Sequence, residues 1–328
     1  MAERLGRAES EPETATGIVR PGPVCEDGVK RAFILDGSNH SDGSIYRGDD
    51  FIRSPIPQRE AMMLSNPTNC QPDMWDCHMH SGQFMMQIVS LKLSNITAAV
   101  DGPVHLYGYF AVRDSLDLLR NYIFNRTRDD PFIMGQGNGI DSDNSLIPMS
   151  GPKRGIGNQA CALIEFDMKI KNGETQEDDF QLIDGAIISG EFAMPNRVFT
   201  QRIEGDCGAV NIRRVLLHSA VEATIQVSIS QVHGNGFSLS LYSCIGGISE
   251  RIQLFDGVIS KPCDLNRFVV AIVPNSPLFL FFKGDQRDGS DHFCSYRLFK
   301  ARKHGYDMEE LKLGCAYILV KVSWSTLN

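Results

Sequence analysis

Residues 150–186 read SGPKRGIGNQACALIEFDMKIKNGETQEDDFQLIDGA, and this stretch says most about the fold. Between residues 162 and 170 every second side chain is apolar, while Glu165, Asp167 and Lys169 occupy the alternate positions. A period of two is typical of a β-strand that buries one face. The stretch therefore predicts a glycine-rich basic turn, a half-buried strand, an acidic turn and a second strand.

The same alternation of apolar and polar residues continues along the chain and predicts an all-β protein. Residues 221–229 (VEATIQVSI) alternate almost without exception, and His-Gly-Asn-Gly at 233–236 separates them from the alternating stretch 237–241. We interpret this pair as a hairpin, because glycine and asparagine suit tight turns between strands. Further strands are expected at 84–93, 104–112, 121–125, 162–170, 180–188, 198–203, 210–217, 251–255, 268–273, 278–282, 293–299 and 315–323.

Short strands without long amphipathic helices between them predict an antiparallel β-sandwich or barrel. Only residues 116–119 and 308–311 suggest helix. A strand, a turn and an aromatic strand at 84–112 resemble 221–242 in spacing, which leaves open a fold of two related halves.

The first 80 residues differ from the rest of the chain. They are polar, and repeated prolines interrupt any periodic pattern. We expect a disordered or extended leader at 1–80, part of which packs as an arm on a β-rich domain at 81–328.

Composition narrows the function classes. The formal net charge of -8 disfavours a general nucleic-acid binder, and no apolar run approaches the roughly 20 residues that span a bilayer. The N-terminus has no apolar core of a secretory signal, so we expect a cytoplasmic or nuclear protein with free thiols at its nine scattered cysteines. Two sequons, at Asn95 and Asn125, are then chance matches.

Two groupings suggest metal-ligand chemistry, and each has a plainer interpretation that we favour. Cys70, Cys77, His78 and His80 are zinc-ligand types, but their spacing matches no known tetrahedral motif. The acidic run at 174–179 lacks the spaced oxygens and the glycine of a calcium loop, so a solvated turn is favoured. We therefore predict no metal site and no cofactor.

The glycine-rich turn at 151–157 contains Lys153 and Arg154 but is no phosphate-binding loop, since a strand and not a helix follows it. We expect both side chains to be exposed and to contact a partner. Replacing both with alanine should then weaken partner binding and leave stability nearly unchanged.

A catalytic triad of His218, Ser219 and Glu222 is disfavoured because neighbours in a strand point to opposite faces. Two alternatives stay open. One is a hydrolase that uses Asp114, His218 and Glu222. The other is a calcium- or lipid-binding module of the C2 type, whose aspartates would be Asp114, Asp117, Asp129 and Asp130.

Several motifs between residues 83 and 326 resemble an uncharacterised domain family that is abundant in grasses. They are AVRD at 111–114 with LD at 116–117, RNYIFN at 120–125, SLIPMSGPKRG at 145–155, DG at 184–185, HSAVEAT at 218–224, LFDG at 254–257 and VSWST at 322–326. The resemblance carries no established activity. It implies a stress or defence context, because the family's domain is sometimes fused to ribosome-inactivating N-glycosidase domains in jasmonate-induced proteins.

Those glycosidases carry Glu-Ala-x-Arg on a helix, where the spacing places acid and base on one face. This chain has Glu222-Ala-Thr-Ile225 in a stretch with strand periodicity. We therefore expect no N-glycosidase activity, no catalytic residues and a non-enzymatic domain that binds an unidentified protein or carbohydrate. The sequence leaves the oligomeric state open.

Overall fold

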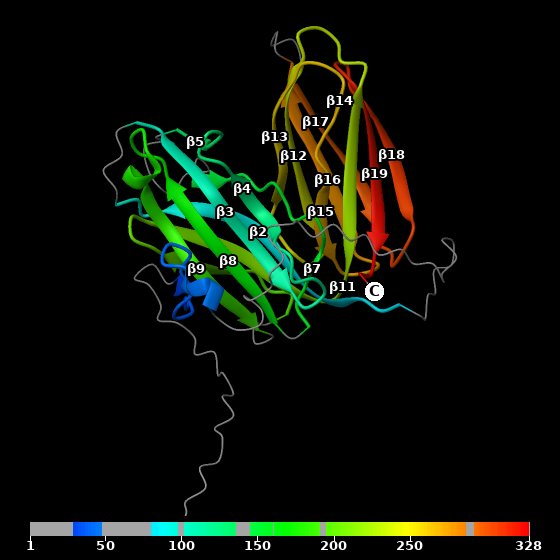
Figure 1. Cartoon of the computed structure of the whole chain (residues 1–328). Helices are drawn as coiled ribbons and strands as arrows, with labels where there is room; N and C mark the ends of the chain where they lie inside the picture. The colour runs from blue at the N-terminus through cyan, green and yellow to red at the C-terminus, as the bar shows by residue number, and fades with distance from the viewer. Residues whose placement is uncertain are drawn as a thin grey trace, which may run out of the picture.

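The computed structural model describes residues 29–47, 80–97, 102–135, 145–159, 161–190, 195–286 and 292–327. Strands dominate these residues, and the prediction of an all-β, mainly antiparallel fold is confirmed (Figure 1). The strands are β1 Lys30–Arg31, β2 Gln83–Ser94, β3 Val104–Asp114, β4 Asn121–Arg126, β5 Phe132–Met134, β6 Leu146–Ile147, β7 Ile156–Gly157, β8 Cys161–Ile170, β9 Phe180–Gly190, β10 Phe199–Glu204, β11 Ala209–Ser230, β12 Phe237–Ile245, β13 Ile252–Ile259, β14 Cys263–Asp264, β15 Phe268–Ile272, β16 Pro277–Asp285, β17 His292–Lys300, β18 Tyr306–Lys312 and β19 Tyr317–Ser325.

These strands form two β-sandwiches side by side (Figure 1). In the first sandwich, the sheet β4-β3-β8-β9 faces a sheet built from β10, the first half of β11, β2, and the short β6 and β7. In the second, the sheet β13-β12-β16-β17 faces β18, β19, the second half of β11, and β14 and β15. Each pair of sheets encloses its own cluster of buried apolar side chains.

The two sandwiches share one topology. β2 and β3 of the first correspond to the second half of β11 and β12 of the second, and β3 pairs with β4 and β8 as β12 pairs with β13 and β16. The pairs β8·β9 and β10·β11 likewise correspond to β16·β17 and β18·β19. The two halves suggested by the sequence spacing are therefore equivalent in strand order and connection.

The long strand β11 joins the sandwiches, where the sequence pattern predicts separate strands at 210–217 and 221–229. Its pairing with β2 shifts register between Leu217 and Ala220, and Ser219 adopts a φ of 55°. Leu216 faces the first core, while Val215 and Leu217 face the second. Because both faces are buried at this point, β11 forms part of the wall between the two cores.

The hairpin predicted around 233–236 is wrong. β11 and β12 lie in opposite sheets of the second sandwich, and the connecting loop is held by the His233 N–H, which donates to the Cys315 carbonyl at 2.8 Å. Both strands alternate because each buries its apolar face in the same core, and alternation alone does not distinguish facing strands from paired strands.

The helical turn predicted at 308–311 is also wrong, because these residues belong to β18 and pair with β19. Residues 116–119 contain no helix either; the Asp114 carboxylate accepts the N–H groups of Leu116 and Asp117 and forms a turn. Helix in the described residues is limited to 3₁₀ turns such as η1 (Ser44–Arg47) and η3 (Gln176–Asp178).

Part of the predicted leader packs against the first sandwich. Residues 29–47, which we call the arm, lie over the outer face of β8 and β9 (blue in Figure 1). β1 of the arm pairs with β10 in parallel, and Ile45 and Leu35 of the arm cover Leu163 and Ala186 of the sheet. The arm therefore packs on the first sandwich, while the other residues of the leader expected at 1–80, except His80 at the start of the next described range, lie outside the described residues.

Candidate functional site

The loop between β6 and β7, residues 148–155, belongs to the first sandwich and contacts the middle of β11, where the two sandwiches meet, and we call it the junction loop. The Asn121 side chain accepts the Lys153 N–H at 2.8 Å and donates to the Arg154 carbonyl at 2.7 Å. The Gly155 N–H donates to Glu222 Oε2 at 2.6 Å, in the middle of β11. The junction loop therefore holds the start of β4 and the centre of β11 in one arrangement.

The buried charge of Arg154 in this loop is paired within the protein, although its Nε has no hydrogen-bond partner among the described residues. Arg154 donates to Asp114 Oδ1 at 2.5 Å, and the Gly157 N–H donates to Asp114 Oδ2 at 2.7 Å. Glu222 has no exposed surface and accepts a second hydrogen bond from the Thr224 hydroxyl at 2.8 Å. Burial outweighs these hydrogen bonds and raises the pKa of Glu222 above its ordinary value.

The expectation that both basic side chains of this loop are exposed is wrong for Arg154, which is 2% exposed. Its guanidinium is turned inward because Asp114, at the buried end of β3, would otherwise carry an unpaired charge. Lys153 is only half buried. A partner contact at Lys153 and Arg154 stays a prediction, and only Lys153 presents accessible side-chain surface for it.

Of the three residues of the hydrolase alternative, the structure brings Asp114 and Glu222 against the same loop as buried acceptors. His218 lies elsewhere, exposed, with its ring 4.5 Å from the ring of Phe84. The two carboxylates hold backbone N–H groups of the loop in place, so they act in this arrangement as structural acceptors.

The four aspartates of the calcium alternative lie at opposite ends of β4. Asp114 and Asp117 precede this strand, whereas Asp129 and Asp130 follow it, about 20 Å away for six extended residues. Asp130 accepts from Arg126 at 2.7 Å, an ion pair at the surface. Within the described ranges, no three His, Cys, Asp or Glu side chains gather as a metal site. Cys70, Cys77 and His78 lie outside the described residues.

Residues 174–178 of the acidic turn are exposed, as expected of a solvated turn, whereas the side chain of Asp179 is buried. Arg128 donates to Asp179 Oδ2 at 2.7 Å and to the carbonyls of Gly173, Glu174 and Thr175. Burial opposes ionisation of Asp179, but the hydrogen bonds from Arg128 and Tyr107 keep the pKa of Asp179 below its ordinary value. This turn is a fixed corner of the first sandwich.

A second buried charge cluster lies under the arm, on the outer face of the first sandwich. Glu165 of β8 accepts from Arg113 Nε at 2.8 Å, from Arg120, and from the Tyr109 hydroxyl at 2.8 Å. His40 of the arm inserts beside them, with Nε2 2.9 Å from Glu165 Oε1. Hydrogen bonds from His40 and Arg120 overcome the burial of Glu165 and hold its pKa well below the usual range.

The outer face of β12, β16 and β17 carries an aromatic cluster, which we call the aromatic face. It comprises Tyr242, Phe279, Phe281, Tyr296 and Leu298. Tyr242 and Phe281 stack with ring centroids 4.9 Å apart, and Phe281 lies 5.8 Å from Tyr296. Tyr296 is 56% and Leu298 52% exposed. This face is a row of rings on neighbouring strands with an apolar, solvent-exposed end.

Two cations border the aromatic face. The Arg251 guanidinium lies 4.9 Å from the Tyr242 ring centroid, and Lys283 Nζ lies 5.6 Å from it. Arg120 makes a similar contact with Tyr109 in the first sandwich, at 4.5 Å. Each sandwich thus places an arginine that directly precedes a strand (β4 or β13) over a tyrosine of the neighbouring strand.

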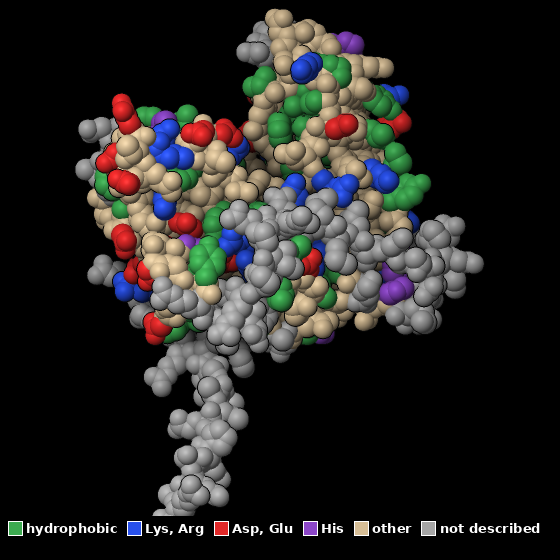
Figure 2. Space-filling view, viewed as in Figure 1, with side chains coloured by type: hydrophobic (Ala, Val, Ile, Leu, Met, Phe, Trp, Pro, Cys, Tyr) green, Lys and Arg blue, Asp and Glu red, His purple; other side chains and the backbone are tan. Residues whose placement is uncertain are grey.

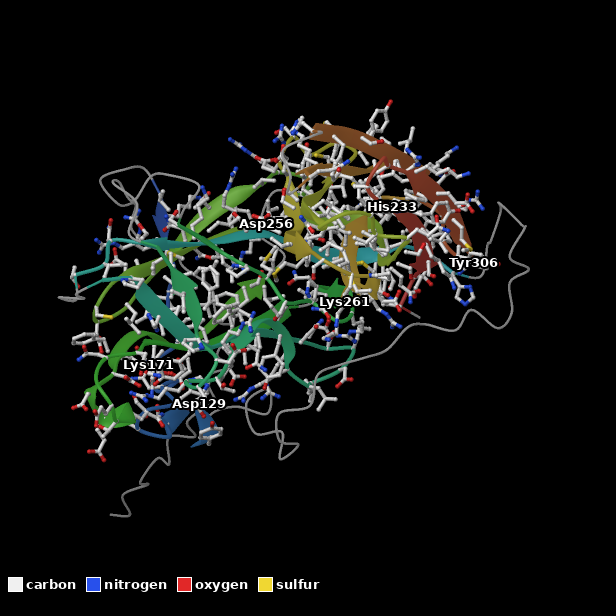
Figure 3. All side chains as sticks on the ribbon, turned by 90° about the horizontal axis from the view of Figure 1, so that it is seen from above. Asp129, Lys171, His233, Asp256, Lys261 and Tyr306 are labelled. Carbon is white, nitrogen blue, oxygen red and sulfur yellow. The ribbon has the colours of Figure 1, made fainter. Side chains whose placement is uncertain are left out.

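A shallow cleft of about 90 Å³ separates the sandwiches near Arg251, Gln253 and Asp256. Its other wall consists of Ser90 and the residues around Met149. Asp256 lies on the side of the second sandwich that faces the first, and Tyr306 of β18 lies on the opposite side (Figure 3). Acidic and basic side chains are interspersed around the notch between the sandwiches (Figure 2).

The profile of DUF6598, a domain of unknown function, matches residues 85–322. The chain belongs to this family. The match covers both sandwiches of the DUF6598 chain and leaves the arm outside it. No curated protein matches the sequence.

Two solved structures, both under 10% identical, show remote likeness to the DUF6598 chain. The calcium-bound C2A and C2B domains of extended-synaptotagmin 2 match with a TM-score of 0.28 and 9% identity over 75% of this chain and 97% of theirs. Human GIVD cytosolic phospholipase A2 matches with a TM-score of 0.26 and 9% identity over 74% of this chain. The chain spans about a third (33%) of the length of that phospholipase. Likeness at this level does not transfer an activity.

Sequence reasoning missed the cluster under the arm and the aromatic face. His40 stands in a polar stretch without periodicity, and its partners Glu165 and Asp184 lie more than a hundred residues away. The aromatic face did have a signal, since Phe279, Phe281 and Tyr296 occupy the alternate, outward positions of two predicted strands. No described helix is long and apolar enough to cross a membrane.

Proposed function

We propose that the DUF6598 chain is a non-enzymatic binding module whose aromatic face takes an extended, acidic segment of a partner protein. One observation carries the proposal. Two topologically equivalent sheets differ in their outer faces: the arm covers that of β8 and β9, whereas Tyr296 and Leu298 on the outer face of β17 are each more than half exposed. The arm supplies a precedent, in the same molecule, for an extended segment on such a face.

The chemistry of the occupant follows from the side chains it would cover. Burying the exposed parts of Tyr296 and Leu298 favours apolar side chains, because each removes apolar surface from water. Tyrosine and arginine are the residue types that most often dominate binding energy at protein interfaces. Arg251 and Lys283 lie on the Tyr242 ring and favour carboxylates beside those apolar side chains.

A binding role also agrees with the structural role of the two buried glutamates whose pKa values are shifted. Glu165 and Glu222, whose pKa values are shifted by their surroundings, are buried and hold internal donors. The family resemblance motivates a stress or defence context, which forms part of this proposal, as does the expected location in the cytoplasm or nucleus. Lys153 would extend the contact surface if the partner also reached the junction loop.

The test is a display library of linear peptides selected against the purified full chain, followed by measurement of Kd by fluorescence polarisation. We expect the selected peptides to combine Asp or Glu with apolar residues. The double variant Tyr296→Ser/Leu298→Ser should bind them about 30-fold more weakly, the equivalent of about 2 kcal/mol at a central contact. Lys283→Glu should also weaken them, since it reverses one attractive charge.

The matched control is Tyr306→Ser/Met308→Ser on β18. These side chains are as exposed, at 59% and 50%, and Tyr306 also contacts a lysine, with Lys321 Nζ 4.8 Å from its ring. This variant should keep the affinity of the wild type. Equal losses in both variants, or a library that yields no specific peptide, would contradict the proposal. Binding of glycans, or of anionic vesicles with calcium, through Tyr296 in place of peptides would assign the face to a different ligand class.

A further inference from the structure

His40 occupies the centre of the contact between the arm and the first sandwich. Its Nδ1 lies 2.7 Å from Asp184 Oδ1 of β9, and its Nε2 lies 2.9 Å from Glu165 Oε1 of β8. The His40 side chain is 6% exposed, so water contributes little to its solvation. Both ring nitrogens face carboxylate oxygens, which are acceptors, and an imidazole can donate from both nitrogens only when it is protonated.

The two carboxylates beside His40, Glu165 and Asp184, differ in their other charged partners. Glu165 has two arginines, Arg113 of β3 and Arg120 ahead of β4, so its charge is balanced without His40. Asp184 has no arginine or lysine partner among the described residues. It accepts the backbone N–H groups of His40 and Ser41, at 2.8 and 3.0 Å, and His40 is its cation.

Two tyrosines complete the surroundings. The Tyr109 hydroxyl of β3 lies 2.6 Å from His40 Nε2 and 2.8 Å from Glu165, and it can donate to either. When His40 is neutral, this hydroxyl can turn its hydrogen to Nε2. Tyr46 of η1 packs its ring edge-on against His40 at 6.1 Å. The cluster therefore tolerates a neutral His40 in geometry, but the buried Asp184 then loses its counter-charge.

We infer that the arm is a proton-dependent strap, held over β8 and β9 while His40 is an imidazolium and loosened when His40 loses that proton. Release would uncover Leu163 and Ala186, the counterpart of the aromatic face on the equivalent sheet. The inference is independent of the peptide-binding proposal, because it concerns the other sandwich.

The direction of the pH dependence follows from linkage. Burial opposes the charge on His40, but the hydrogen bonds that its ring donates to Asp184 and Glu165 outweigh it and raise the pKa of His40 above its ordinary value. The docked arm therefore binds the proton more tightly than a free arm does. Its stabilisation is fully present below the ordinary histidine pKa of about 6.5 and is lost as the pH rises through the docked value. The pKa of Asp184, lowered to about 2, keeps that carboxylate ionised throughout this window.

The test is amide hydrogen exchange of the full chain between pH 5.5 and 8.5, corrected for the intrinsic pH dependence of exchange. Two reporters cross the contact: the Leu35 N–H donates to the Ala186 carbonyl at 2.9 Å, and the Ala186 N–H donates to Ser38 Oγ at 3.0 Å. We expect their protection to fall several-fold more over this range than that of the β12 amides, which follows only the stability of the whole fold. Unchanged protection at Leu35 would overturn the inference.

Two variants and one control separate the strap from a general loss of stability. His40→Asn cannot carry a charge, so the protection of Leu35 should be lower and independent of pH. Asp184→Asn keeps the histidine and should make the protection of Leu35 less dependent on pH. This second variant tests the strap even if the arm of His40→Asn does not dock at any pH. His292→Asn removes an exposed histidine that lies 2.6 Å from Asp285 in the second sandwich, and it should keep the wild-type profile. A wild-type profile in either arm variant would contradict the strap.

Discussion

The Gly155 N–H donates to Glu222 Oε2 at 2.6 Å, and this bond ties the junction loop to the centre of the strand that both sandwiches share. Glu222 follows the register shift at which β11 leaves the first core for the second. The bond therefore couples the loop conformation to the place where the two halves of the protein meet.

Burial of Glu222 leads to a prediction on pH dependence. Its raised pKa means that the folded state holds the proton more readily than the unfolded chain, so this contribution to stability is present below the ordinary carboxyl pKa of about 4.3 and is lost as the pH rises through the folded value. Glu222→Gln keeps an acceptor for Gly155 and adds a donor for Thr224. Its free energy of unfolding relative to the wild type should rise between pH 4 and 8 in urea denaturation, and a constant difference would argue against the raised pKa.

Arg154 and Lys153 should differ sharply in their effect on stability. Arg154→Ala leaves the buried Asp114 without its cation and should cost about 3–5 kcal/mol. Lys153→Ala keeps the backbone N–H that donates to Asn121 and should cost under about 1 kcal/mol. Urea denaturation of both single variants at pH 7 measures this contrast; equal effects would mean that Arg154 contributes no buried ion pair.

Glu165 should be the most sensitive residue of the cluster under the arm. Glu165→Gln removes the charge that pairs with Arg113 and Arg120 and should destabilise the protein by about 3 kcal/mol or more. Arg126→Gln breaks an exposed ion pair with Asp130 on the same sheet and serves as the control, with an expected loss under about 1 kcal/mol. Thermal unfolding of the two variants compares them, and similar midpoints would contradict the expected order.

Gly108 should tolerate no side chain in the middle of β3. Its φ of 97° is a region that other residues avoid, and an added Cβ would stand 2.1 Å from the Asp167 carbonyl oxygen on β8. Gly102 has a similar φ of 100° but open space around it, so Gly102→Ala measures the backbone strain alone. Gly108→Ala should cost at least about 2 kcal/mol more than Gly102→Ala in denaturation experiments, since the β3·β8 pairing must move apart.

The strands were predictable because their signal is local. β3 and β8 coincide with stretches whose alternation is visible within ten residues, and one buried face is enough to produce it. β2 and β16 contain short, nearly continuous apolar runs, which also favour a strand. The partner of each strand was not predictable in this way. β12 alternates beside β11 in the sequence yet pairs with β13 and β16, because the loop after Ser230 carries the chain across the core.

The two buried charge clusters could not be predicted from the local sequence pattern, for a related reason. The sequence pattern places Glu165 on the solvent-exposed face of a half-buried strand. The side chain would be exposed there if the arm did not cover that face. Arg154 reads as an exposed basic turn, although Asp114, forty residues earlier, draws it inward. The orientation of a buried charged side chain depends on its oppositely charged partner, and a local sequence pattern does not predict which distant residue that partner is.

The amino-acid sequence by itself therefore determined the class of the protein, which is all-β, and the positions of most strands, because a strand with one buried face shows that burial as a period of two. The tertiary structure alone decided that the strands form two equivalent sandwiches around a shared β11, that His40 docks between Asp184 and Glu165, and that one sheet face is covered while its counterpart is exposed. These features depend on contacts between residues far apart in the chain, which form only when loop closure brings their elements together.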